Sequence, residues 1–529
     1  MNATPQVDHT TVRFRHPCRD GSTTRCNACL RMDELEADSE GHIIPGPVSI
    51  PYSTRAELMR ATRTAQNEHH DPIILRLPPE LASRIFEFCI PESTTQVDDR
   101  FALISVCQGW RRIALSTPTL WAQCTLPLLG ESRPGPQILK EWLERSQALP
   151  LKMIIHAFPG TVPHVGSREY NEARALIQVL NSCSERWNDL SLALIPTILL
   201  NLLEGNDKGA PALESLTLRD IALPSIKFSL EHVKTVKVLS VRNAGLLFNM
   251  APNMEECYIP LHEPRFPNLE GRDVLLQPYT SRIVHHHLRK LVIRSAEWLW
   301  QTEALFLRLT VPALEWLTVV GASEEKTIDI PLPAIHSLLV TSSCILKVLS
   351  LKGNRYRTED LIDLLAQDQL SSVECLEIAA NGLSEGENYL SDQVFERLAR
   401  TAVKNNDTIQ PFLPSLRLLA FDAGSVYSQA SFPAREFPWD QFLQFLACHR
   451  PDPPVGHPMR PLRDVRLWFN LSPQEYSDES LGTNSEEIAL SLFDLQNRGE
   501  IELCIEHPVS EKSKPRALFR CGFRTRKYS

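Results

Sequence analysis

One short pattern recurs along most of the chain and constrains its fold more than any other feature. Each copy has apolar residues at the first, fourth and sixth of six consecutive positions. Several copies follow a proline, which stops the preceding segment and favours entry into a strand. The ten copies are Leu213/Leu216/Leu218, Val236/Leu239/Val241, Met254/Cys257/Ile259, Leu288/Leu291/Ile293, Leu314/Leu317/Val319, Ile335/Leu338/Val340, Leu346/Leu349/Leu351, Val373/Leu376/Ile378, Leu416/Leu419/Phe421 and Leu462/Val465/Leu467.

Each copy predicts a short strand that pairs in parallel with its neighbours and points its apolar residues into a continuous core. The copies start at uneven intervals, so residues 137–508 are predicted to form an irregular α/β leucine-rich-repeat-like solenoid. Helices are expected at 138–147, 168–187, 360–367 and 392–403, with strands at 151–155 and 190–192. The alternative is a leucine-rich doubly wound sheet, which lacks the support of a glycine-rich turn between strand and helix.

The residues between the core positions are expected on the open face of the strands. Trp316 among Arg294 and Lys352 has the composition of a binding hot spot, and these three are predicted to contact a protein target. A shift of one residue in register would turn them inward. The full set is Ser215, Thr217, Arg219, Lys290, Val292, Arg294, Trp316, Thr318, Val320, Val348, Ser350, Lys352 and Glu377.

A second distinctive stretch, residues 72–121, is predicted to form a small helical unit. Its first helix opens at Leu77-Pro78-Pro79-Glu80-Leu81 and runs to Cys89, with Leu81, Ile85, Phe88 and Cys89 on one face. A second helix carries Leu103, Val106, Cys107, Trp110 and Ala114, and Ser116-Thr117-Pro118 ends it. So few residues bury too little apolar surface to be comfortably stable alone, which predicts a partner or a neighbouring domain.

These residues resemble the F-box family. The matching pieces are Leu77-Pro78-Pro79-Glu80-Leu81, Val106-Cys107 with Trp110-Arg111-Arg112-Ile113-Ala114, and Ser116-Thr117-Pro118-Thr119-Leu120-Trp121, although the loop between the helices is longer than usual. The resemblance implies an all-α F-box-like domain at 72–125, so that the chain is α+β overall. It also implies binding to an SKP adaptor, and through it a cullin, by Leu77, Pro78, Leu81, Ile85, Val106, Cys107 and Trp110. An ordinary helical hairpin that caps the larger domain is the alternative.

Composition limits the class of partner. The net charge of −9 gives no general reason to bind nucleic acid or an anionic membrane. The thirteen cysteines are odd in number and often lie in apolar patterns, which favours free thiols in the cytoplasm or nucleus. No signal core or membrane-spanning run is recognised, so we expect no membrane association.

The two ends of the sequence have a different composition. Residues 1–52 are polar and are predicted to be disordered. Within them Cys26 and Cys29, with Cys18 and His16 nearby, have zinc-ligand spacing but lack a second pair, so free thiols are favoured over a metal site. Residues 53–71 predict a polar helix. The basic tail, 509–529, is interpreted as solvated, with nuclear import or phosphate binding as the alternative.

The sequence contains no recognised catalytic motif, and His285-His286-His287 is interpreted as a solvated turn rather than a chelating site. We therefore expect no enzyme activity, cofactor or metal. Together with the predicted repeats, the F-box resemblance implies a substrate-recognition subunit of a cullin-RING ubiquitin ligase of the SKP–cullin–F-box type, with an unknown protein target. The alternatives are a repeat scaffold without a ligase role and an enzyme whose motifs are not recognised.

Overall fold

The computed structural model describes residues 57–62, 77–89, 99–158, 162–221, 223–238, 244–260, 282–295, 300–321, 330–353, 358–380, 392–401, 412–422, 439–447, 462, 464–468 and 502–506. The predictions for 1–52 and its cysteines, and for the tail 509–529, lie outside these residues. Of the polar helix predicted at 53–71, the described part is 57–62, and it is helical. The chain divides into two compact units: Met1–Ile154 with Asn171–Val179, and Ile155–Tyr170 with Leu180–Ser529.

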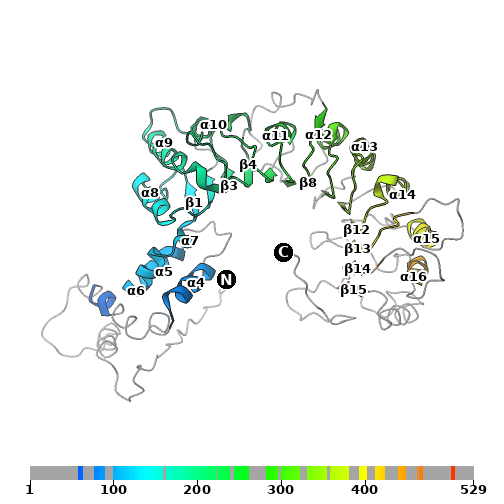
Figure 1. Cartoon of the computed structure of the whole chain (residues 1–529), viewed down its shortest axis with the longest axis horizontal. Coiled ribbons are helices and arrows are strands. Elements are labelled where there is room, and N and C mark those ends of the chain that lie inside the picture. The colour runs from blue at the N-terminus through cyan, green and yellow to red at the C-terminus, as the bar shows by residue number, and fades with distance from the viewer. Residues whose placement is uncertain are drawn as a thin grey trace, which may run out of the picture. The chain divides into compact units, whose positions relative to one another are not determined.

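After the helical residues 57–62, the first unit continues with short helices (Figure 1). They are α4 (Pro79–Cys89), α5 (Asp99–Val106), α6 (Gln108–Leu115) and α7 (Pro118–Trp121), followed by β1 (Gln123–Pro127) and α8 (Pro136–Arg145). β2 (Leu151–His156) and α9 (Arg168–Asn181) contribute residues to both units. This unit extends past residue 125, where the helical domain was expected to end.

The predicted start and end of α4 are confirmed. Pro78 provides the carbonyl that accepts from the Leu81 and Ala82 N–H groups, and Pro79 occupies the first turn, where a missing N–H costs nothing. The prediction of one helix from Leu103 to Ala114 is wrong. Cys107 has an extended backbone, with φ −156° and ψ 173°, so α5 ends at Val106 and a new helix starts at Gln108.

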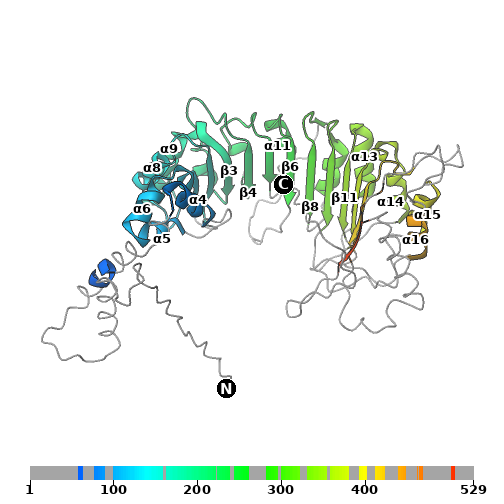
Figure 2. The same ribbon diagram turned by 60° about the horizontal axis from the view of Figure 1, so that its bottom comes forward.

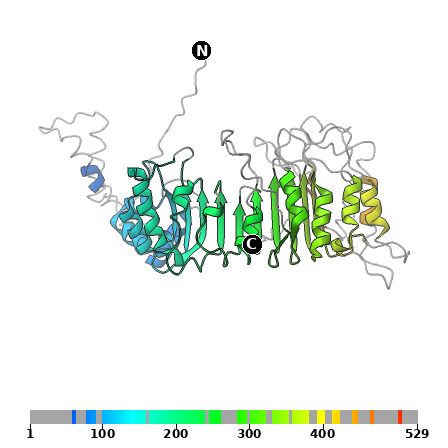
Figure 3. The ribbon, with the colours of Figure 1, turned by 90° about the horizontal axis from the view of Figure 1, so that it is seen from above.

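The second unit is built on parallel strands whose order in the sheet follows their order in the chain (Figures 2 and 3). That order lacks the reversal that defines a doubly wound sheet. The strands are β3 (Trp187–Ala193), β4 (Ser215–Arg219), β5 (Thr235–Val238), β6 (Glu256–Pro260), β8 (Lys290–Ser295), β10 (Trp316–Gly321), β11 (Val348–Gly353), β12 (Cys375–Ala380), β13 (Leu418–Asp422), β14 (Asp464–Trp468) and β15 (Glu502–Glu506). A separate pair joins β7 (Ile283–Val284) to β9 (Leu309–Thr310).

Helices connect successive strands and lie on one side of the sheet (Figure 1). The mixed helix-and-strand class predicted from the sequence is therefore confirmed, with a large parallel sheet as its main feature. The helices are α10 (Thr197–Leu200), α11 (Ala244–Met250), α12 (Trp300–Arg308), α13 (Leu332–Ser342), α14 (Thr358–Leu365), α15 (Asp392–Arg400) and α16 (Trp439–Ala447).

The repeated apolar pattern marks the strands and their core. Its residues in β4, β6, β8, β10, β11, β12 and β13 are all buried, and neighbouring strands pair them in register, as Leu291, Leu317, Leu349 and Leu376 show. For β14 the pattern also coincides with the strand. Side chains alternate between the two faces of a strand, so this register sends the residues between the core positions to the other face.

Two copies of the pattern are wrong. Ile335/Leu338/Val340 lies in helix α13, where Leu332, Ile335, Leu338 and Leu339 are buried and Val340 is exposed. Three- and four-residue steps fit a helix as well as this pattern, and Pro333 is tolerated in the first turn.

The copy at Val236/Leu239/Val241 is out of register by three residues. β5 buries Val233, Val236 and Val238, whereas 239 and 241 lie outside the described residues. The sequence matches the pattern both at 233/236/238 and at 236/239/241. Pairing with β4 selects 233/236/238, because the Lys234 and Thr235 N–H groups donate to the Glu214 carbonyl.

Candidate functional site

Helix α4 exposes an apolar face. Leu81, Ile85 and Phe88 have exposed fractions of 53%, 38% and 81%, and Cys89 is exposed beside them. The opposite face of the same helix buries Ala82 and Phe86 completely. We call Leu81, Ile85 and Phe88 the α4 face.

Contacts with α6 and α7 hold α4 in this orientation. The Phe86 ring packs against the Trp110 ring with 4.8 Å between centroids. The Thr117 hydroxyl donates to the Ile113 carbonyl across 2.7 Å, which leaves its oxygen to accept from the Ser83 hydroxyl across 2.9 Å. Trp121, buried beneath, donates from Nε1 to the Ala114 carbonyl across 2.8 Å. The residues of the second and third motif pieces thus fix which face of α4 reaches the surface.

The predicted adaptor contacts separate into two groups. Pro78, Leu81 and Ile85 are exposed, and Leu77, Val106 and Trp110 are half-buried. Cys107, in contrast, is buried, and its Sγ accepts from the Trp110 N–H across 3.4 Å at the start of α6. Its observed position supports the local helix geometry, and it does not present a side chain to a partner.

The second candidate surface lies on the sheet of the other unit, on the strand face opposite the core. Its centre is Lys290 on β8, whose Nζ lies 5.2 Å from the Tyr258 ring centroid and 4.7 Å from that of Trp316. Trp316 is 38% exposed and donates from Nε1 to Thr318 across 2.8 Å. Tyr258 donates its hydroxyl hydrogen to Glu256 across 2.7 Å, and partial burial, with that carboxylate, raises the pKa of the phenol.

The three predicted target-binding residues lie on this same face, with Trp316 at the start of β10 and the other two beside Val320, four residues farther along that strand. Arg294 and Lys352 occupy the same register position on β8 and β11, on either side of Val320 in β10. Arg294 is exposed, whereas Lys352 pairs with Glu377 at 3.1 Å. Trp316 starts β10, next to Lys290 and Val348 on the flanking strands.

The other residues predicted on the open face divide by burial. Arg219 is exposed, and the half-buried residues are Ser215, Thr217, Lys290, Val292, Thr318, Val348 and Glu377. The prediction fails for Val320 and Ser350, which are buried. Ser350 is satisfied there by donating to Glu377 across 2.8 Å. Tyr258 and Lys237 were missed, although Tyr258 stands between two core positions of its own repeat and was therefore visible in the pattern.

A row of alternating charges borders the same strands. It occupies the second position of successive repeats, where each residue's N–H donates to the carbonyl of the one before. Side-chain ion pairs join Lys234 to Glu214 at 2.8 Å, Lys347 to Glu315 at 3.0 Å and Arg417 to Glu374 at 3.3 Å. The row comprises Glu214, Lys234, Glu255, Arg289, Glu315, Lys347, Glu374 and Arg417. Opposite charges on neighbouring strands favour pairing over repulsion, so this row is explained by the stability and register of the sheet.

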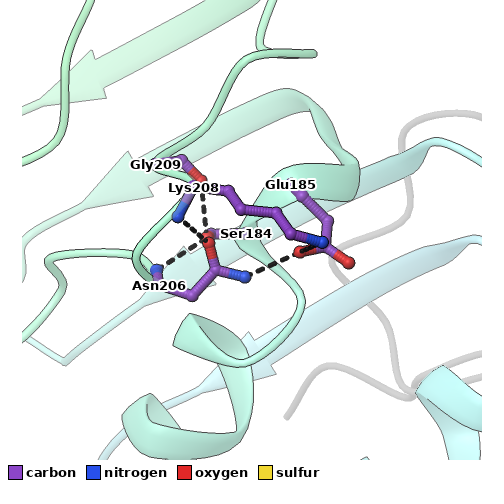
Figure 4. Close-up of polar contacts among 5 residues, drawn as sticks. All are labelled: Ser184, Glu185, Asn206, Lys208 and Gly209. Carbon is purple, nitrogen blue, oxygen red and sulfur yellow. Dashed lines mark hydrogen bonds and ion pairs between the residues drawn. The ribbon is translucent and has the colours of Figure 1, made fainter.

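A polar cluster around Ser184 also has a structural explanation (Figure 4). The Ser184 hydroxyl donates to the Gly209 carbonyl across 2.7 Å and accepts from the Asn206 N–H across 2.8 Å. Asn206 donates from Nδ2 to Glu185 across 2.8 Å, and Glu185 lies 3.5 Å from the Lys208 ammonium. The hydroxyl is therefore engaged by main-chain groups that shape the loop, which is not the arrangement of an activated nucleophile.

The titratable groups buried in the second unit are also engaged or inactive. His285 is buried, which corrects its assignment to a solvated turn, while His286 and His287 are exposed. Burial lowers the pKa of His285, and burial raises the pKa of the Cys257 thiol to about 12. Among the described residues, no group of three or more metal-ligating side chains is placed to hold a metal ion. Within the same part of the chain, no helix is long and apolar enough to cross a membrane.

Comparison with known proteins gives no family assignment. No family model and no curated protein matches the chain. A solved structure that resembles it is that of a structural genomics target from Bacteroides fragilis, with 12% sequence identity and a TM-score of 0.29. The match covers 61% of this chain and 66% of the other, just under two thirds of its length. A likeness of this size supports no conclusion about function.

Proposed function

We propose that this protein is a substrate-recognition subunit of a cullin-RING ubiquitin ligase, with an F-box-like helical domain that binds an SKP adaptor. The observation that carries the proposal is the α4 face, on which three large apolar side chains are exposed. Grouped exposed apolar residues commonly mark protein-binding sites. The face follows directly on Leu77 and Pro78, the first piece of the F-box-like sequence.

The packing beneath this face supports the same proposal. Trp110 and Trp121 lie in the second and third pieces of the resemblance, and they contact Phe86 and Ala114 inside the helical unit. A domain that displays a docking helix needs such a base, because the apolar side chains that bind the partner are unavailable for its own core. The division into exposed and buried motif residues gives both groups a physical role.

The second unit would then hold the target. Its strands follow one another in chain order and carry one apolar pattern, which supports an irregular leucine-rich-repeat-like solenoid. Such a receptor acts by proximity: it raises the effective concentration of a target lysine near a ubiquitin-charged enzyme on another subunit. It needs no catalytic group of its own.

The test is co-purification of the full chain with an SKP adaptor. The variant Leu81→Ala/Ile85→Ala should lose most adaptor binding while it keeps its fold, because both side chains are exposed. The matched control is Ile138→Ala/Leu307→Ala, which removes two exposed apolar side chains from α8 and α12 and should bind normally. Circular dichroism of each variant checks that folding is unchanged.

A repeat scaffold without a ligase role is the competing function. It requires the first helices to cap the repeats through Leu81 and Trp110. A folded chain that fails to bind the adaptor would favour the scaffold. Adaptor binding that survives in the Leu81→Ala/Ile85→Ala variant would show that the α4 face is not the docking site.

A further inference from the structure

The strand face of β4, β5, β6, β8 and β10 gathers positive charge around two aromatic rings. Lys290 lies between the rings of Tyr258 and Trp316, and Lys237 lies 5.5 Å from the Tyr258 centroid on its other side. Arg294 stands two positions after Val292 in β8 and Arg219 ends β4, so both point to this face. We call Arg219, Lys237, Lys290, Arg294, Tyr258 and Trp316 the basic strand patch.

The patch has a local excess of positive charge. Among the strand-face residues described from β4 to β10, four cations accompany one carboxylate, Glu256. Glu256 already accepts the Tyr258 hydroxyl. Within the described part of the chain, Arg219 and Arg294 are exposed and form no ion pair, and the interactions of Lys237 and Lys290 are with aromatic rings.

Neighbouring charges on the same unit are arranged differently. The bordering row alternates in sign and pairs internally, as Lys347 with Glu315 shows, and Lys352 on β11 is neutralised by Glu377. Sheet stability therefore explains those cations but not the ones in the patch, which repel one another without gaining a carboxylate partner. Uncompensated charge beside one exposed and one half-buried aromatic side chain, Trp316 and Tyr258, is typical of a recognition surface.

We propose that the basic strand patch binds an acidic, extended segment of another protein. Carboxylates of the segment would pair with the Arg and Lys side chains, and its apolar groups would lie on Trp316 and Tyr258. Strands spaced about 4.8 Å apart make β4 to β10 roughly 19 Å wide, which an extended chain crosses in about six residues. The proposal deepens the proposed receptor function by giving the chemical class of its target.

A protein segment fits this surface better than nucleic acid does. The chain as a whole carries a charge of −9, and the row that borders the patch alternates in sign, so it does not extend the positive charge of the patch. A long polyanion needs a continuous track of cations along its backbone, whereas a short acidic segment matches the four cations of the patch alone.

The test measures binding of a fluorescein-labelled dodecapeptide of alternating glutamate and serine by fluorescence anisotropy, with the full chain and no adaptor. The comparison peptide has glutamine in place of glutamate, and a uridine dodecamer represents nucleic acid. The variants are Lys237→Glu and Arg294→Glu. The matched control is Lys227→Glu, because Lys227 is exposed in the same unit, lies outside the patch and changes the net charge equally.

We expect saturable binding of the glutamate peptide, weakened about threefold to tenfold by each patch variant and little by Lys227→Glu. Raising the ionic strength from about 0.05 M to about 0.5 M should weaken it further. Equal binding of the glutamine peptide, or equal loss in the Lys227→Glu control, would overturn the proposal. Tighter binding of the uridine strand would assign the patch to nucleic acid, and self-association lost in Lys237→Glu would assign it to a second copy.

This outcome is separable from that of the proposed function. Peptide binding is measured with the full chain without adaptor and depends on the sheet unit, whereas adaptor capture depends on the α4 face. If the native chain captures the adaptor but does not bind the glutamate peptide, the patch proposal alone is refuted. Peptide binding without adaptor capture keeps the patch and removes the ligase role.

Discussion

Two phenylalanines on α4, two positions apart, are predicted to respond in opposite ways to truncation. Phe86 is fully buried and packs against Trp110, whereas Phe88 is 81% exposed and has the Arg84 guanidinium 5.7 Å from its ring centroid. Phe86→Ala and Phe88→Ala remove the same atoms from the same helix. The pair therefore isolates the effect of the face.

The expected magnitudes follow from burial. Phe86→Ala should lower the free energy of unfolding of the helical unit by about 3–5 kcal/mol, because it removes a buried ring and leaves a cavity. Phe88→Ala loses little buried area and one exposed cation–π contact, so its cost should stay below about 1 kcal/mol.

Hydrogen–deuterium exchange of peptides from residues 108–121 reports these changes without requiring the whole chain to unfold at once. Each 1.4 kcal/mol of lost stability raises the exchange rate about tenfold, so Phe86→Ala should accelerate exchange by about a hundredfold or more. Phe88→Ala should change it by less than about fivefold. Similar acceleration in both variants, or greater acceleration in Phe88→Ala, would show that α4 packs by its other face and would remove the basis of the α4 face.

Three further outcomes follow from buried groups in the second unit and from one tight turn. His285 donates from Nε2 to the Ala251 carbonyl and accepts from the Leu288 N–H at Nδ1, so protonation breaks the second bond. The pKa of His285 in the folded state lies below the unfolded value of about 6.5, so the free energy of unfolding should fall as the pH drops through 6.5 and level off below the folded-state pKa. In a pH series of melting curves, His285→Gln should flatten this part of the profile. Gly205 has φ +81°, and a Cβ there would lie 3.1 Å from the Ser184 hydroxyl oxygen. Gly205→Ala should therefore lower the free energy of unfolding in urea by about 1–2 kcal/mol, whereas Gly135→Ala, at an open position, should have little effect. A neutral result for Gly205→Ala would contradict the loop geometry. Burial raises the pKa of Cys257 to about 12 and that of Cys344 to about 11. Iodoacetamide at about pH 8 should therefore label exposed Cys89 in the folded protein and these two thiols after denaturation. Rapid labelling of Cys257 in the folded protein would show that β6 is not packed as described.

The sequence predicted most of the sheet because the evidence for it is local. Apolar residues such as Leu291 and Ile293 alternate with polar ones in each strand, and every repeat states the same alternation independently. The alternating charges at the second repeat position, from Glu214 to Arg417, are also present in the sequence, but they were recognised only in the structure. A pattern that repeats at a fixed structural position is readable without knowing how the chain packs.

The candidate site was predicted less completely than the sheet. Arg294, Trp316 and Lys352 lie on one strand face as predicted, because alternate positions of paired strands share a face. Their contact with a target stays a prediction. Lys237 depended on the register of β5, which its sequence leaves open between two overlapping matches, whereas Tyr258 stands between two predicted core positions of β6 and was overlooked. Pairing with the Glu214 carbonyl decides the register of β5.

The sequence by itself determined where α4 begins and ends and where the buried strand positions recur, since proline, capping and periodicity act within a few residues. Tertiary structure decided that Phe86 packs inward while Leu81, Ile85 and Phe88 remain outside, that Cys107 divides one expected helix into two, and that the 332–342 segment is a helix. In each of these three cases, two arrangements of the segment have similar local energies. The difference between them arises from contacts with residues distant in the chain, which no local pattern records.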